Sequence, residues 1–133
     1  MIDKKSPTPI YEQIIKEINR EILADELKAG DMLPSVRELA LSISTNPNTV
    51  QKAFSELEGQ GLAKSSPGIG RYVSENAKEK LQGILKGRIN ELEELLSALK
   101  NGGISHEDVD KVVKSVYGTS RSSRRDSSLA WLD

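Results

Sequence analysis

The sequence contains no cysteine, one histidine and few aromatic residues: three tyrosines, one tryptophan and one phenylalanine. Without cysteine the chain can form no disulfide, no thiolate zinc site and no cysteine nucleophile. His106, alone near the start of an expected helix, is interpreted as a surface residue, and no metal or cofactor is expected. Only 36% of the residues are hydrophobic. The core is therefore small, which favours stabilisation by a partner subunit.

Long apolar segments and a net charge are also lacking. No apolar run approaches the roughly 18 residues of a transmembrane helix, and the N-terminus has no signal-peptide pattern. We therefore expect a soluble, cytoplasmic protein without a membrane partner. Nineteen lysines and arginines stand against 20 acids, and residues 1–74 contain nine bases and ten acids. This balance counts against nucleic-acid binding but does not exclude it, because phosphate contacts need only a local basic face, which a dimer doubles.

Residues 45–53, with the sequence TNPNTVQKA, are typical of a helix start that faces DNA. Asn46 can cap the helix, and Pro47 suits the first helical position, where no N–H partner is needed. The first turn and a half then carries amide, hydroxyl and ammonium groups of the kind that contact base edges and phosphates. We call these four side chains the reading face: Asn48, Thr49, Gln51 and Lys52. Residues 39–55 contain no acid, and the opposite side of the helix is apolar at helical spacing.

Three helices and a hairpin are expected in residues 1–75. Thr8 is expected to cap the first helix, which extends to about residue 24 with isoleucines at helical spacing. A capping box that begins at Ser35 opens a short second helix, and the third is the helix described above. Two extended segments, 62–65 and 71–74, flank a Pro-Gly-Ile-Gly tip, which predicts a β-hairpin with a longer loop. This order predicts a winged helix-turn-helix domain in a mainly α-helical protein.

Residues 76–117 are predicted to form a helical dimerisation unit. A long helix over residues 77–100 carries apolar side chains at alternating spacings of four and three, the heptad pattern of a helix–helix interface. We call these side chains the leucine seam: Leu85, Ile89, Leu92, Leu96 and Leu99. A second helix, capped by Ser105, carries valines on one face, and packing of the seam against these valines within one chain is the alternative to dimerisation. The Ser/Arg-rich residues 118–133 are expected to form a flexible tail, whose arginines are either solvated or an auxiliary phosphate contact: Arg121, Arg124 and Arg125.

Four motifs occur together in this order and spacing: LPSVRELA at residues 33–40, NPNTVQKAF at 46–54, LEGQG at 57–61 and GIGRYV at 68–73. Over residues 8–74 the chain therefore resembles the N-terminal DNA-binding domain of the GntR family of bacterial transcription regulators. The short two-helix segment that follows resembles the YtrA-type subfamily, whose C-terminal part is a helical dimerisation unit rather than a ligand-binding domain.

The resemblance implies a homodimer that binds double-stranded DNA at a pseudo-palindromic operator and is expected to act as a repressor. The recognition helix would lie in the major groove, and the hairpin, or wing, at the neighbouring minor groove. The positions that match the family's DNA-contacting residues are these: Ser35, Arg37, Asn46, Asn48, Thr49, Gln51, Lys52, Gly68, Gly70 and Arg71. Pro47 and Gln51 stand where many relatives have arginine, so the operator sequence cannot be transferred. Members of the subfamily tend to regulate transporter operons.

Each assignment has a structural alternative. In these alternatives Asn46 is a helix cap without a DNA contact, and Arg37 pairs with the neighbouring Glu38. The wing glycines then serve only to turn the hairpin. A second function class is a winged-helix module that docks on protein instead of DNA, which the near-neutral charge favours and the acid-free helix start opposes. An enzyme is not expected, because the sequence shows no nucleophile–base pair, metal cluster or phosphate-binding loop. A small-molecule effector could bind between the two domains, but no group of polar residues identifies it.

Overall fold

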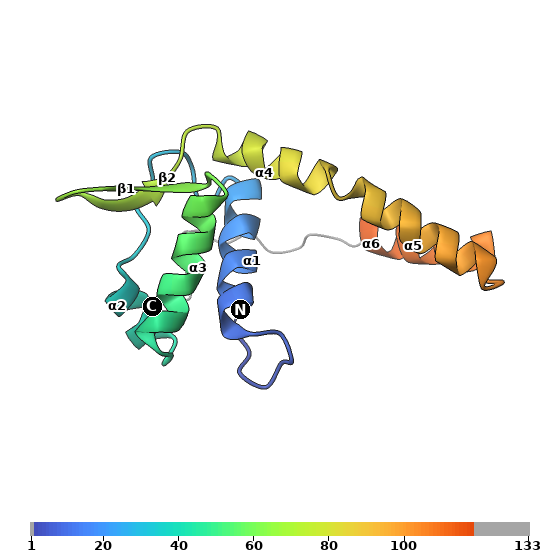
Figure 1. Cartoon of the computed structure of the whole chain (residues 1–133), viewed down its shortest axis with the longest axis horizontal. Coiled ribbons are helices and arrows are strands. Elements are labelled where there is room, and N and C mark those ends of the chain that lie inside the picture. Colours follow the sequence, from blue (N-terminus) through green and yellow to red (C-terminus); the bar gives the residue numbers. More distant parts are fainter. Residues whose placement is uncertain (1, 119–133) are drawn as a thin grey trace. The chain divides into compact units, whose positions relative to one another are not determined.

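The computed structural model describes residues 2–118, which form six helices and one two-stranded hairpin (Figure 1). The elements follow the chain in this order: α1 Ile10–Leu23, α2 Val36–Ser42, α3 Pro47–Gly59, β1 Ala63–Ser66, β2 Gly70–Val73, α4 Ala77–Lys86, α5 Ile89–Asn101 and α6 His106–Gly118. This confirms the predicted fold class, which is mainly helical with a small hairpin and a helical C-terminal region. The interpretation of the Ser/Arg-rich tail, with Arg121, Arg124 and Arg125, lies outside the described residues.

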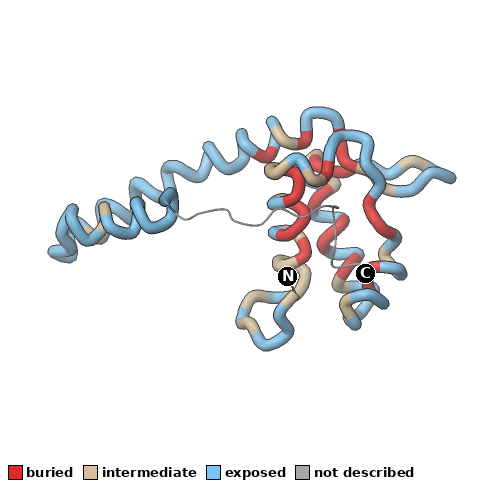
Figure 2. Tube along the Cα trace, turned by 180° about the vertical axis from the view of Figure 1, so that it is seen from behind, coloured by how far each residue is buried: buried red, intermediate tan, exposed pale blue. Residues whose placement is uncertain are grey.

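The chain divides into two compact units between Gln82 and Gly83, which lies inside α4. Sequence patterning suggested a change of unit before α4, at residue 76. The structure divides the chain later because Ala77 and Leu81 are buried with the core of the first unit. Figure 2 shows that the buried residues stop within α4, and neither α5 nor α6 contains one. The first unit therefore holds the hydrophobic core of the described chain.

The core of the first unit is formed by α1, α2 and α3 around one set of aliphatic side chains and a single phenylalanine. Ile14, Ile18 and Ile22 of α1 recur every four residues, so they lie on one face and are at most 2% exposed. Phe54 on α3 is fully buried, as is Leu39 on α2. Packing of α3 against both other helices holds its opposite side toward solvent.

The first helix begins differently from the prediction that Thr8 caps it. Pro9 occupies the cap position, and no side chain there bonds a backbone N–H. The Thr8 carbonyl instead accepts a hydrogen bond of 2.9 Å from the Gln13 side-chain amide. The prediction that Thr8 caps α1 was therefore wrong, because the segment before α1 folds back onto the helix and is bonded by Gln13.

The wing is an antiparallel hairpin in which Ala63 pairs with Val73 and Ser66 with Gly70. Its strands lie one residue away from the predicted segments, 62–65 and 71–74. The connection between α1 and α2 runs along β2: the Leu33 N–H donates to the Arg71 carbonyl at 2.9 Å, and the Val73 N–H to the Asp31 carbonyl at 2.9 Å. These bonds tie the wing to the start of the helix-turn-helix.

The predicted continuous helix over residues 77–100 is wrong, because the chain breaks at residues 87–88 between α4 and α5. Gly83 and Gly87 are four residues apart, and glycine is one of the weakest residues in a helix interior. The Arg88 N–H bonds the Leu85 carbonyl three residues earlier, at 2.9 Å, which tightens the turn. The end of α5 at Asn101 agrees with the sequence, as does the cap of α6, where Ser105 Oγ accepts from the Asp108 N–H at 3.1 Å.

Candidate nucleic-acid interface

The start of α3 is fixed by its cap. Asn46 has extended backbone angles, and its side-chain Oδ1 accepts a hydrogen bond of 2.7 Å from the Asn48 N–H. Pro47 fills the first helical position. The side chain of Asn46 therefore caps α3 in the free protein, which agrees with the alternative interpretation of Asn46 as a helix cap. The cap sets where the reading face begins.

The reading face lies on the solvent side of α3, opposite the buried Val50, Phe54 and Leu57. Asn48, Gln51 and Lys52 are exposed, and Thr49 is half-buried. The Gln51 amide donates to Ser55 Oγ at 3.0 Å, one turn further along the same face. The surface is therefore polar, lacks carboxylates over its first two turns, and can meet base edges without removing a buried side chain.

Lys52 has a partner that the sequence did not reveal. Its ammonium nitrogen lies 3.9 Å from the centre of the Tyr11 ring on α1, a cation–π contact. The ring holds the lysine at the edge of the reading face nearest the start of α1. Tyr11 and Lys52 are distant in sequence, and only the packing of α1 against α3 brings them together.

The segment before α1 is also fastened at this end of the fold. The Gln13 side chain bonds both backbone groups of Asp3, accepting from its N–H at 2.6 Å and donating to its carbonyl at 2.8 Å. Lys4 Nζ donates to the carbonyl of Ser44, in the turn between α2 and α3, at 2.6 Å. Lys4 therefore places a positive charge beside the helix-turn-helix turn. Composition alone gave no sign of this local charge.

On α2, Ser35 is a cap and Arg37 is exposed. Ser35 Oγ accepts from the Glu38 N–H at 3.0 Å, half of the predicted capping box. Within residues 2–118 no ion pair joins Arg37 to Glu38, so the proposed neighbouring salt bridge is not formed. The Arg37 guanidinium stays exposed in the first turn of the helix.

Arg71, on β2 close to the tip of the wing, is held inside the first unit. Its guanidinium lies 3.1 Å from Glu58 Oε1 and 5.1 Å from the centre of the Phe54 ring, and only 18% of its side chain is exposed. Ser65 Oγ donates to the second Glu58 oxygen at 2.6 Å. We call this group the wing brace: Glu58, Ser65 and Arg71. It joins both strands of the wing to the end of α3.

The brace also changes the acidity of Glu58. The hydrogen bond from Ser65, and then the charge and hydrogen bond of Arg71, lower the pKa of Glu58, although partial desolvation opposes them. The carboxylate is therefore ionised at neutral pH and keeps both partners. Arg71 already has this intramolecular role, and its contact with DNA stays a prediction. The sequence did not predict this role of Glu58, because 13 residues separate it from Arg71.

The two wing glycines differ in their surroundings. Gly68 has φ +77° and open space around it, so it serves the turn. Gly70 has φ +115°, and a Cβ there would lie 3.0 Å from the Met32 terminal methyl group. The positive φ is the main reason for glycine at position 70, and the close Met32 methyl group leaves little room for a side chain there.

In the second unit, the structure brings together part of the leucine seam. Leu85, Ile89 and Leu92 line one surface hollow of about 350 Å³, which they share with Leu95 and the polar Arg88 and Glu91. The first four residues of the leucine seam each expose more than a third of their surface, and Leu99 is half-buried. The break at residues 87–88 therefore leaves the first three members on one surface.

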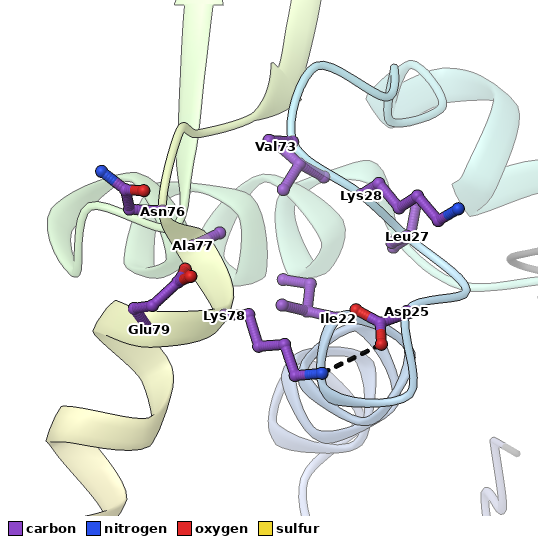
Figure 3. A pocket seen from close by; sticks show the side chains of 10 residues that line it. Ile22, Asp25, Leu27, Lys28, Val73, Asn76, Ala77, Lys78 and Glu79 are labelled. Carbon is purple, nitrogen blue, oxygen red and sulfur yellow. Dashed lines mark hydrogen bonds and ion pairs between the residues drawn. The ribbon is translucent and has the colours of Figure 1, made fainter.

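A small pocket of about 170 Å³ lies in the first unit, where α1 ends and α4 begins (Figure 3). Ile22, Val73 and Ala77 are among its apolar walls, and Lys78 Nζ lies 2.9 Å from Asp25 Oδ2 at its edge. Asp25 and Asn76, which also line it, both have φ near +60°. The ion pair therefore links the end of α1 to the first turn of α4, and the pocket lies beside it.

Three helices with a capped, outward-facing third helix, followed by a hairpin, define a winged helix-turn-helix protein of the DNA-binding class. Residues 10–73 match the family model "Bacterial regulatory proteins, gntR family". The repressor YtrA of Bacillus subtilis (strain 168) is 43% identical over 116 residues, which cover 86% of this chain and 89% of that protein. The chain therefore belongs to the GntR family, and it is a DNA-binding transcription regulator.

Other similar proteins agree with this assignment. The uncharacterised regulator YhcF of Bacillus subtilis (strain 168) is 39% identical, over 68% of this chain and 81% of that protein. A crystal structure of a transcriptional regulator from Oenococcus oeni matches with a TM-score of 0.66 and 33% identity, covering 88% of this chain and 98% of that one. YtrA from Sulfolobus acidocaldarius, a GntR-family transcription factor, matches with a TM-score of 0.53 and 33% identity, covering 89% and 96%.

The family is in general not enzymatic. Among residues 2–118, no group of three or more histidine, aspartate or glutamate side chains is arranged to hold a metal ion. None of the helices in the same range is long and apolar enough to cross a membrane.

Proposed function

We propose that this chain is a homodimeric repressor that binds a pseudo-palindromic operator, and that the operator controls a transporter operon. The observation that carries the DNA-reading part is the capped start of α3, which presents an exposed, acid-free polar face over a fully buried apolar one. Repression is supported by the matching relatives YtrA and NagR of Bacillus subtilis (strain 168), both of which are transcriptional repressors. The transporter operon rests on the resemblance to the YtrA-type subfamily alone.

The DNA contacts proposed for each protomer divide into two kinds. Asn48, Thr49 and Gln51 are proposed to contact base edges, since amides and hydroxyls can bond adenine and other bases in the major groove. Arg37 and Lys52 are proposed to contact phosphates, which position the protein without selecting sequence. The remaining proposed contacts come from the α2 and α3 caps and the wing: Ser35, Asn46, Gly68, Gly70 and Arg71.

Dimerisation is proposed because the second unit has no core of its own. Neither α5 nor α6 contains a buried residue, and each has only 13 residues. Isolated helices of this length are marginal in water, where helix stability comes mostly from packing an apolar face. Leu92 is 48% exposed, and Val113 on α6 is 45% exposed. Pairing of two protomers through the leucine seam and these valines would cover both faces.

The dimer explains how a chain with little net charge can hold DNA. Two recognition helices would enter successive major grooves, about 34 Å or somewhat more apart along the duplex. Each phosphate contact then occurs twice, and the two half-sites double the number of base contacts. The second unit, paired with that of another protomer, sets the half-site separation in this proposal.

Selection of binding sites from a random DNA duplex pool tests the proposal. We expect an enriched inverted repeat, and fluorescence anisotropy should show that its affinity falls steeply with salt, because bound counterions are released. A flat recovery of sequences would contradict operator reading. Enrichment of a single, unrepeated half-site would contradict the dimer.

Two further parts of the proposal concern alternatives. A winged-helix module that docks on protein would give no enriched duplex, and the shared regulatory role of the relatives favours DNA instead.

An effector of unknown identity is proposed to act by changing how the helical units of the two protomers pack against each other. The pocket beside Lys78 and Asp25 offers such a molecule apolar walls and a charged edge, and occupancy there would compete with this ion pair.

A further inference from the structure

The tip of the wing carries no charge. Residues 65–70 have the sequence SSPGIG, without a lysine, arginine, aspartate or glutamate. Of the two cations that flank the tip, Arg71 is bound within the wing brace, and Lys64 lies on the strand before it. The tip itself therefore offers no cation for insertion into the minor groove, which is the usual means by which proteins recognise a narrow groove.

The most prominent side chain at the tip is Ile69, which is 65% exposed. Its N–H donates to the Ser66 carbonyl at 3.0 Å, which closes the turn at the end of the hairpin. Gly68 and Gly70, on either side, have φ +77° and +115°. The two glycines turn the backbone sharply and leave Ile69 as the side chain that projects from the tip.

Ile69 does not stand alone, because Met32 supports the same surface. Met32 is 48% exposed, packs against Gly70 and forms an isolated bridge with Tyr72 on β2. Both side chains line an open groove of about 610 Å³, which continues to Ser35 at the start of α2. The apolar wing tip is thus continuous with the surface that is proposed to contact the DNA backbone.

We propose that Ile69, supported by Met32, is the wing residue that contacts the apolar deoxyribose walls of the minor groove beside each half-site. Apolar side chains in the minor groove read its shape and deformability, while cations read its negative potential. The wing tip of this protein therefore selects flanking sequence by groove width, and its residues 65–70 add no phosphate neutralisation. This inference rests on the proposed operator binding and assigns a specificity-determining residue to it.

The test compares Ile69→Ala, Ile69→Leu and Ile69→Arg on the selected operator, with flanks of A·T tracts or mixed sequence, over a salt series. Loss of apolar contact in Ile69→Ala should weaken operator binding about tenfold, with the salt slope unchanged. Ile69→Leu keeps the apolar volume and should bind like the wild type. Ile69→Arg should steepen the salt slope by about one to two for the two wings and acquire a preference for A·T-tract flanks.

Thermal unfolding of all three variants should match the wild type, since residue 69 is exposed and its neighbouring glycines are unchanged. Wild-type affinity in Ile69→Ala, or an unchanged salt slope and flank preference in Ile69→Arg, would overturn the inference. A wild-type protein that selects no operator would remove this inference together with the proposed function. Specific wild-type binding that is insensitive to residue 69 would remove only the inference.

Discussion

Replacement of Leu92 by glutamate is expected to separate the dimer. Leu92 lies in the first turn of α5 and is 48% exposed in the isolated chain, as part of a surface hollow that it shares with Leu85 and Ile89. Full burial of a leucine side chain contributes about 1.5–3 kcal/mol, so covering the exposed half contributes about 1 kcal/mol in each protomer. A symmetric dimer loses this contribution twice.

The glutamate adds a second cost. A carboxylate enclosed by leucines must either lose hydration without a partner or take up a proton, at a cost of about 1–3 kcal/mol for each copy. Together the two effects amount to at least about 4 kcal/mol per dimer, which raises the dissociation constant of the dimer roughly 1,000-fold. Because α5 and α6 have no buried residue of their own, helix content should fall when the variant dissociates.

Sedimentation velocity over a range of protein concentrations measures this shift. Asn90→Glu is the matched control, because it introduces the same charge on α5 at an exposed position, nearly opposite Leu92 on the helical wheel. The control should remain dimeric under conditions where Leu92→Glu is monomeric. An intact Leu92→Glu dimer, or equal dissociation of both variants, would refute the assignment of the leucine seam to the interface.

Two further predictions concern the first unit. Arg37→Ala should weaken binding to all duplexes alike and reduce the salt slope by about two for a dimer that loses two phosphate contacts; unchanged affinity in an anisotropy titration would remove Arg37 from the interface. Glu58→Gln should destabilise the first unit most at neutral pH. Because the folded-state pKa of Glu58 lies below its usual value of 4.5, the stabilisation is present above that pH and is lost as the pH falls through the folded value. The free energies of unfolding of the wild type and Glu58→Gln, measured with urea, should therefore become equal in acid. A difference that does not change with pH would contradict the stabilising role of the wing brace.

The sequence predicted the order of the elements because helix caps and hydrophobic spacing act locally. Asn46 with Pro47, and Ser35 with Glu38, mark helix starts within a few residues, and the structure places both starts there. The hairpin follows from glycines that tolerate positive φ. These signals need no knowledge of which helix packs on which.

The errors and omissions have two physical origins. The helix over residues 77–100 satisfied the heptad pattern, but Gly83 and Gly87 weaken its backbone, which hydrophobic spacing does not register. The contacts of Lys52 with Tyr11 and of Arg71 with Glu58 join different elements, so they exist only after the core has formed. A residue proposed to contact DNA can therefore already be held by a partner in the fold.

The most direct test of DNA reading by α3 is the affinity of Asn48→Ala for the selected operator and for an unrelated duplex. Gln60→Ala, which removes an amide at the other end of the same helix, serves as the control. We expect Asn48→Ala to lose about 1–3 kcal/mol on the operator and nothing on the unrelated duplex, while the control binds both like the wild type. Equal affinity of Asn48→Ala and the wild type for the operator would contradict the account, as would an equal loss on both duplexes.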